Sequence, residues 1–166
     1  MEPTLDVGQR VLVNRLSYRL GGDPNIGDIV VFHPPEGAVS GSGTQCGVGR
    51  PELSDGQPCP EPTAEKADTN FIKRVVGLPG DRLKILDGIP IVNGEPVDGD
   101  WQIRPCRGAG GCDFPEEITI PPDHYFMMGD NRGASDDSRY WGPVPRDWLI
   151  GTAFATYWPP DRLGLF

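Results

Sequence analysis

The sequence predicts a mostly β protein with long loops and little helix. Glycine and proline are both abundant, with 23 and 19 residues, and they follow no repeat period. This composition is typical of many short strands joined by turns. The dipeptides Asp87-Gly88 and Asn93-Gly94 each stand between short apolar runs, which is the strongest short-range signal for a β-hairpin. No segment predicts a helix longer than a turn or two.

The first half of the chain predicts two strands followed by a long insertion. Residues 8–16 predict a strand with Val11 and Val13 on one face and Leu12 on the other. Residues 28–33 form a nearly continuous apolar run, which favours a strand buried on both faces. Residues 34–69 are rich in Gly, Pro, Ser, Thr and Glu and hold few large apolar side chains. A loop of this length is either functional or mobile, and we expect a surface insertion within a single domain that spans 1–166.

The second half predicts further short strands around turns. Residues 70–83 contain a β-rich stretch, the breaker G-L-P-G-D, and a second β-rich stretch. Residues 99–117 predict another loop. Later strands are expected at 117–120, 124–128 and 148–157.

Charge and composition argue against several classes of function. The net charge of −9 argues against a nucleic-acid partner, because phosphate binding needs a basic face. The two histidines, His33 and His124, have no partner at ligand spacing, so the sequence predicts neither a His-based triad nor a metal or cofactor site. No apolar run approaches the roughly 18 to 20 residues of a membrane span, and no signal peptide is visible.

Lys73 is the candidate general base. Side chains alternate across a strand, so Lys73 lies on one face between Phe71 and Val75. Burial between apolar neighbours disfavours a charged ammonium and lowers its pKa. A lysine that loses its proton near neutral pH can act as a general base. The alternative is a lysine that extends its ammonium into solvent from a half-exposed strand.

A second polar stretch, 129–145, gathers aspartates, serines and arginines in a short span with Gly and Pro at both ends. Such side chains bond their own backbone and build an ordered loop. The alternative is a solvated acidic turn, but Tyr140-Trp141 and the two arginines inside the stretch favour an ordered one.

Four segments in order resemble the motifs of the bacterial type I signal peptidases, a family of serine–lysine proteases. They are M-E-P-T-L at 1–5, G-D-I-V-V-F at 27–32, K-R-V-V-G-L-P-G-D at 73–81, and G-D-N-R-G-A-S-D-D-S-R-Y-W-G-P-V-P at 129–145. The resemblance implies antiparallel β-sheets or a partly open barrel. It also implies an extracytoplasmic catalytic domain that works at a membrane surface and removes signal peptides from secretory preproteins after small residues.

The resemblance also implies roles for particular residues. Lys73 would be the base of a Ser/Lys dyad, and Ser135 would hydrogen-bond and orient it; the alternative for Ser135 is a loop serine that caps its own backbone. A salt-bridged scaffold without direct chemistry is expected from Arg74, Asp130, Asp137 and Arg139. Candidates for the substrate pocket are Met1, Ile29 and Val31.

In the family, the nucleophilic serine stands immediately before the methionine that matches Met1. We therefore expect this chain to begin after the nucleophile, with the membrane anchor further upstream, and to be inactive alone. One alternative is a non-catalytic β-rich binding module, although that would not explain why Lys73 and Ser135 both fall on family positions. A self-cleaving serine–lysine protease would need a cleavable linker and usually a DNA-binding domain, and the sequence contains neither.

The four cysteines predict two disulfides, given the extracytoplasmic location that the resemblance implies. Three pairings are possible. Cys46–Cys59 and Cys106–Cys112 are favoured because each pair is close in sequence.

The chain ends in an apolar tail, 158–166, with no core assigned to it. We expect an exposed apolar patch, which includes Met1 or Leu5 and this tail, to rest on lipid. The alternative is that the tail packs on the sheet.

Overall fold

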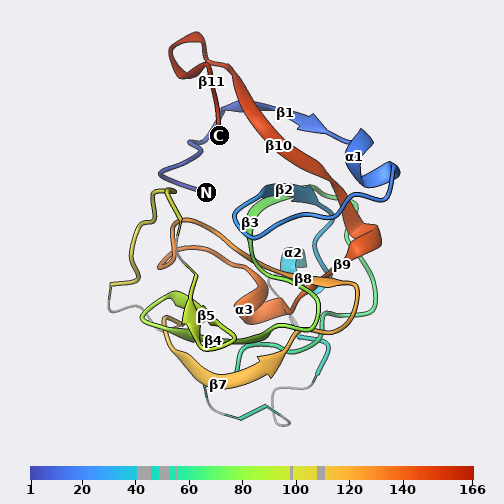
Figure 1. Ribbon diagram of the computed structural model, residues 1–166, viewed down its shortest axis with the longest axis vertical. Helices are drawn as coiled ribbons and strands as arrows, with labels where there is room; N and C mark the ends of the chain where they lie inside the picture. Colours follow the sequence, from blue (N-terminus) through green and yellow to red (C-terminus); the bar gives the residue numbers. More distant parts are fainter. Residues whose placement is uncertain (41–45, 49–52, 55, 98, 108–110) are drawn as a thin grey trace.

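A computed structural model describes residues 1–40, 46–48, 53–54, 56–97, 99–107 and 111–166. It contains two antiparallel sheets, one of seven strands in the order β1-β10-β2-β3-β8-β9 with β11 paired to β10, and one of four strands in the order β6-β5-β4-β7 (Figure 1). The predicted mostly β fold with antiparallel sheets is confirmed. The sheets do not close into a barrel.

The larger sheet consists of β1 (Arg10–Asn14), β2 (Ile29–Phe32), β3 (Phe71–Gly77), β8 (His124–Met128), β9 (Val144–Pro145), β10 (Leu149–Trp158) and β11 (Gly164–Leu165). The smaller sheet consists of β4 (Arg82–Leu86), β5 (Ile89–Val92), β6 (Glu95–Pro96) and β7 (Phe114–Thr119). The described helices are α1 (Leu16–Arg19), α2 (Gly37–Ser40), α3 (Ser138–Trp141) and the 3₁₀ turns η2 (Arg146–Trp148) and η3 (Pro160–Arg162). Within the described ranges no helix exceeds four residues, as the sequence predicted.

Strand β3 joins the two hydrophobic cores. Its alternating side chains place Val75 in a core with Trp141 and Val76 in a core with Leu83. The predicted turn follows, where the Asp81 carboxylate accepts a hydrogen bond from the Leu78 amide at 2.9 Å. The strands on either side of this turn do not pair as a hairpin; β3 belongs to the larger sheet and β4 to the smaller one.

The two predicted hairpins are confirmed in the smaller sheet. Asp87 and Gly88 connect β4 to β5 with φ of 51° and 74°, and Asn93 and Gly94 connect β5 to β6 with φ of 52° and 91°. Two successive positive φ angles are the signature of a type I′ turn.

The expectation of a loop up to residue 117 is wrong at its end, because β7 begins at Phe114. The strand contains Pro115, which is tolerated because β7 is an edge strand, where a missing amide donor breaks no ladder bond. The strand also shifts register against β4, between Leu83 and Ile85.

The described part of the 34–69 segment is fastened to the rest of the domain. Pro35 and Lys66 form an antiparallel bridge across its ends. The Cys59 amide donates a hydrogen bond to the Arg139 carbonyl at 3.0 Å, and Cys59 is buried. Residues 41–45, 49–52 and 55 of this predicted surface insertion lie outside the described residues.

Both predicted disulfides are confirmed, Cys46–Cys59 and Cys106–Cys112, with Cα atoms 5.7 Å apart in each. The second disulfide packs on the β4–β5 turn. A Cβ atom at Gly88 would lie 2.9 Å from the Cys106 Cβ, and the Gly88 amide donates to the Cys112 carbonyl at 2.8 Å.

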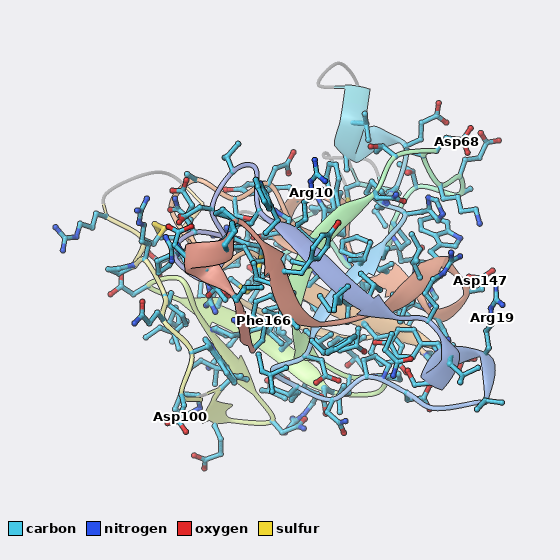
Figure 2. All side chains as sticks on the ribbon, turned by 90° about the horizontal axis from the view of Figure 1, so that it is seen from above. Arg10, Arg19, Asp68, Asp100, Asp147 and Phe166 are labelled. Atoms are coloured by element: carbon cyan, nitrogen blue, oxygen red, sulfur yellow. A yellow bond between two sulfur atoms is a disulfide. The ribbon has the colours of Figure 1, made fainter. Side chains whose placement is uncertain are left out.

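The apolar tail folds back along β10 through its backbone and leaves its side chains outward. Leu165 pairs with Ala155, and the Phe166 amide donates to the Phe154 carbonyl at 3.2 Å. Leu165 is nevertheless 82% exposed and Phe166 47% exposed. Figure 2 shows Phe166 on the face formed by β1 and β10. The described residues contain no helix that is long and apolar enough to cross a membrane.

Removing the Cys46–Cys59 disulfide should destabilise the domain. We expect Cys46→Ala/Cys59→Ala to lower the free energy of unfolding by about 2–4 kcal/mol, because an open chain of this separation gains conformational entropy when unfolded. Urea unfolding measures the effect. Mass mapping of non-reduced peptides from the unmodified chain serves as control, since a bond between the two loops would contradict the pairing.

Candidate active site

The candidate site centres on a contact between Lys73 and Ser135. Lys73 lies in the middle of β3, opposite Val30 of β2. Its Nζ donates a hydrogen bond to the Ser135 Oγ at 2.8 Å. Burial lowers the pKa of Lys73 from its ordinary value, and the charge of Arg139 lowers it further, while the neighbouring aspartates oppose the shift. The arrangement holds a lysine that loses its proton more readily than a free one.

Gly129 allows this contact to form. A Cβ atom at Gly129 would lie 2.2 Å from the Ser135 Oγ and 3.4 Å from the Lys73 Nζ. Any larger residue would displace the serine from the lysine. The sequence analysis did not single out Gly129, although its position at the start of the 129–145 motif is a signal that could have identified it.

A buried ion pair fastens β3 to the loop that carries Ser135. The Arg74 guanidinium binds the Asp130 carboxylate through two hydrogen bonds, Nε to Oδ1 at 2.9 Å and Nη2 to Oδ2 at 2.7 Å. Arg74 also donates to the Gly27 carbonyl at 2.7 Å and lies over the Trp101 ring, 4.9 Å from its centroid. Arg74 is 5% exposed and Asp130 is fully buried.

A second buried pair orders the loop internally. Asp137 accepts from the Arg139 Nε at 2.7 Å and from the Gly129 amide at 3.0 Å. Arg139 donates further to the carbonyls of Arg132 and Ser135, at 2.8 and 3.0 Å. The predicted scaffold thus consists of two separate pairs, one between elements and one within the loop. The ordered loop that the sequence predicted is confirmed.

Arg132 and Ser138 support the same loop and were not assigned by sequence reasoning. Arg132 is buried and donates through Nη1 to the Gly88 carbonyl, which links the loop to the β4–β5 turn. The Ser138 Oγ accepts from the Met127 amide at 2.9 Å, which links it to β8. Both residues lie within the 129–145 motif, but their partners are distant in sequence.

The N-terminal segment is bound next to Lys73. The Thr4 hydroxyl donates to the Asp130 carboxylate and accepts from the Arg74 Nη2 at 3.4 Å. Burial lowers the pKa of the Met1 amino group, and the charge of Lys73 lowers it further. The amino end of Met1 therefore lies within electrostatic reach of the lysine.

A cleft of about 580 Å³ opens over these groups. Its floor and walls come from the N-terminal segment, β2, β3 and the Ser135 loop, and its lining includes Met1, Val31, Ile72, Lys73 and Ser135. In the part of the chain that the structure describes, no group of three or more His, Cys, Asp or Glu residues could hold a metal ion.

Of the three residues expected to line a substrate pocket, Met1 and Val31 line this cleft. Ile29 does not. It lies on the same face of β2 as Val31, but it is 2% exposed and packs in a cluster with Leu5 and Ala153. Leu5 covers Ile29 because the N-terminal segment folds back over β2, which is a tertiary contact.

Comparison with known proteins gives a consistent result. The family described as signal peptidase, peptidase S26, matches residues 1–158. A relative from Synechocystis sp., named "Probable signal peptidase I-2", is 36% identical over 165 residues, which cover 99% of this chain and 62% of the relative. The signal peptidase I of Leptolyngbya laminosa is 36% identical over 164 residues, which cover 99% of this chain and 67% of the relative.

Among solved structures, a signal peptidase I from Enterococcus faecalis superposes with a TM-score of 0.47 and 22% identity, over 78% of this chain and 96% of that one. The chain spans less than two thirds of the length of the Synechocystis relative described above. By the match over 1–158, the chain belongs to the signal peptidase family, peptidase S26.

Proposed function

We propose that this chain is the catalytic domain of a serine endopeptidase that removes signal peptides from secretory preproteins after small residues. The observation that carries the proposal is the 2.8 Å contact of Lys73 with Ser135, at a lysine whose pKa is lowered by burial and which lines an open cleft. A non-catalytic binding module would have no need of a lysine held in this way. The family membership supports the same activity.

Lys73 is assigned the role of general base. A neutral Nζ takes the proton of a serine hydroxyl as the serine oxygen attacks the scissile carbonyl carbon. The tetrahedral intermediate then collapses, the C–N bond breaks, and Lys73 returns the proton to the leaving amine. Water next attacks the acyl ester while Lys73 takes its proton. The ester bond breaks, the signal peptide leaves with a new carboxyl group, and Lys73 returns the proton to the serine oxygen. Ser135 orients the amine throughout and forms no covalent bond.

The nucleophilic serine is assigned to the position directly before Met1, as the family motif implies. The position of Met1 supports this assignment, because Met1 lines the cleft together with Lys73. Burial, and then the charge of Lys73, lower the pKa of the Met1 amino group. A residue bonded to that nitrogen would begin beside the base. The ion pairs of Arg74 with Asp130 and of Arg139 with Asp137 hold the site without direct chemistry.

The substrate pocket is assigned to the apolar part of the cleft. Met1, Val31 and Ile72 line it, and Ile29 supports the wall from behind through Leu5. Such apolar walls suit a small residue such as alanine before the scissile bond.

The domain is further assigned to the extracytoplasmic face of the membrane, where its two disulfides are stable and its exposed apolar tail rests on lipid.

Replacing Lys73 should abolish cleavage. In a chain extended upstream to include the serine, we expect Lys73→Ala to lower kcat/KM for a precursor peptide with alanines before the scissile bond by about a thousand-fold or more, since members of a catalytic unit act together. Because the base must be neutral and the pKa of Lys73 is lowered, kcat/KM of the extended chain with Lys73 intact should rise with pH and level off below the ordinary lysine value of about 10.4.

Lys84→Ala, on β4 of the other sheet, is the matched control and should leave both the rate and the pH profile unchanged. A folded Lys73→Ala variant that keeps more than a small fraction of activity would exclude Lys73 as the base. Circular dichroism of both variants checks that they are folded.

The position of the nucleophile predicts a second result. We expect a polypeptide of residues 1–166 to fold and to show no detectable cleavage of the same precursor peptide, whereas a polypeptide extended upstream through the serine is active. An acylating serine probe should label only the extended one. Comparable turnover by both would mean that the nucleophile lies elsewhere in 1–166.

The apolar tail should contribute to membrane binding. We expect Leu165→Gln/Phe166→Gln to weaken sedimentation with zwitterionic phosphatidylcholine vesicles by about ten-fold, because interfacial binding scales with the apolar area that enters the bilayer. The control is Leu86→Gln/Ile89→Gln, at two exposed apolar residues of the smaller sheet. An equal loss of vesicle binding in both variants, or no loss in the tail variant, would show that the tail does not bind the membrane.

A further inference from the structure

A second cleft, of about 270 Å³, shares no lining residue with the active-site cleft. It lies where α1, η2 and the start of β10 meet the end of β2. Its charged and titratable lining residues are Arg15, Arg19, His33, Lys66, Arg146 and Asp147. Four of these carry a fixed positive charge and one a negative charge, in a protein whose net charge is −9.

One of these cations is fixed in place and forms part of the wall. The Arg146 Nε binds the Asp23 carboxylate at 2.7 Å, and Nη2 donates to the carbonyls of Tyr18 and Gly22 at 3.2 and 2.6 Å. Its guanidinium lies over the Tyr18 ring, 5.0 Å from the centroid. Arg146 therefore has its charge largely compensated and shapes the cleft.

The other three cations are not held in ion pairs by described residues, although Lys66 also lines a neighbouring pocket together with Glu36, Glu65 and Asp68. Arg15, Arg19 and Lys66 are exposed, and none of them forms an ion pair with any described residue. Asp147 is the single carboxylate among the lining residues, and Figure 2 shows it at the same edge of the molecule as Arg19. The cleft thus presents guanidinium and ammonium donors to solvent, and these groups favour phosphate oxygens.

Exposed leucines lie directly beside these cations. Leu16 and Leu20, on and next to α1, are 62% and 77% exposed, and they alternate in sequence with Arg15 and Arg19. Leu12 on β1 is 43% exposed and pairs with Ala155 of β10, the residue that also pairs with Leu165 of the tail. The face viewed in Figure 2 contains β1, β10 and the tail residue Phe166, with Arg19 at its edge.

We propose that the cleft binds the phosphate headgroup of an anionic phospholipid while Leu16 and Leu20 enter the bilayer interface. Unpaired cations and exposed leucines on a single turn match the two halves of a phospholipid, whereas a small soluble anion would leave the leucines in water. The headgroup would fix the rotation of the domain on the membrane, which the apolar tail alone does not determine. The proposal rests on the membrane location assigned above and adds a lipid class to it.

Vesicle binding of the 1–166 polypeptide tests the proposal without requiring peptidase activity. The probes are vesicles of phosphatidylcholine alone and vesicles with 30 mol% phosphatidylglycerol, in about 0.1 M salt, where charges further than about 10 Å away are screened. We expect tighter binding to the anionic vesicles. Since each basic residue near an anionic surface contributes about five-fold in affinity, Arg15→Gln/Arg19→Gln should reduce that preference by about 25-fold.

Arg82→Gln/Lys84→Gln is the matched control, because it removes the same net charge from β4 of the other sheet. We expect the control to keep the preference for anionic vesicles. Loss of the preference in both variants, or its retention in Arg15→Gln/Arg19→Gln, would overturn the proposed site. The tail variant is judged by binding to phosphatidylcholine alone and the Arg15→Gln/Arg19→Gln variant by the preference for anionic vesicles, so the two membrane proposals can fail separately.

Soluble glycerol 1-phosphate, at about the millimolar level, separates a lipid site from a site for small anions. We expect it to leave binding to the anionic vesicles unchanged, because it offers Leu16 and Leu20 no apolar partner. Displacement of the domain from the vesicles by glycerol 1-phosphate would overturn the assignment to lipid.

Discussion

The buried ion pair of Arg74 and Asp130 is the interaction on which the rest of the site depends. It ties β3 to the loop that carries Ser135, and Thr4 adds the N-terminal segment to the same carboxylate. Arginine suits this position because its planar guanidinium binds a carboxylate in two places and still reaches the Gly27 carbonyl and the Trp101 ring. Loss of either partner leaves an unpaired buried charge, which costs about 3–5 kcal/mol. Three segments that are distant in sequence are therefore fastened at one point.

Local signals predicted much of the fold. The type I′ turns at Asp87-Gly88 and Asn93-Gly94 and the buried strand β2 follow from backbone preferences and side-chain alternation over a few residues. Local signals did not predict the start of β7. Its proline is acceptable because the strand lies at the edge of a sheet, and the order of strands in a sheet is a tertiary property. The separation of β3 and β4 into different sheets also depends on tertiary contacts, so local signals could not predict it.

In the candidate site, too, some features were predictable from local sequence and others depend on tertiary packing. Alternation along β3 indicated a partly buried Lys73, and the family resemblance indicated its partner Ser135, which the structure places in contact with it. The burial of Ile29 and the need for glycine at position 129 could not be predicted, because both result from packing between segments. Ile29 is covered by Leu5, and Gly129 is required because Ser135 approaches it too closely for a side chain. The roles of these residues in catalysis remain proposals that the kinetic experiments address.

The position of β3 between the two cores has a consequence for the maturation of the protein. Val75 packs into one core and Val76 into the other, and Arg132 ties the loop that carries Ser135 to the β4–β5 turn. The surroundings of Lys73 are therefore complete only when both sheets have assembled. In a partly assembled chain the lysine would remain in water and keep its ordinary protonated state. The lowered pKa of Lys73 is therefore a property of the fully assembled domain, and it would be absent from a polypeptide whose smaller sheet had not yet formed.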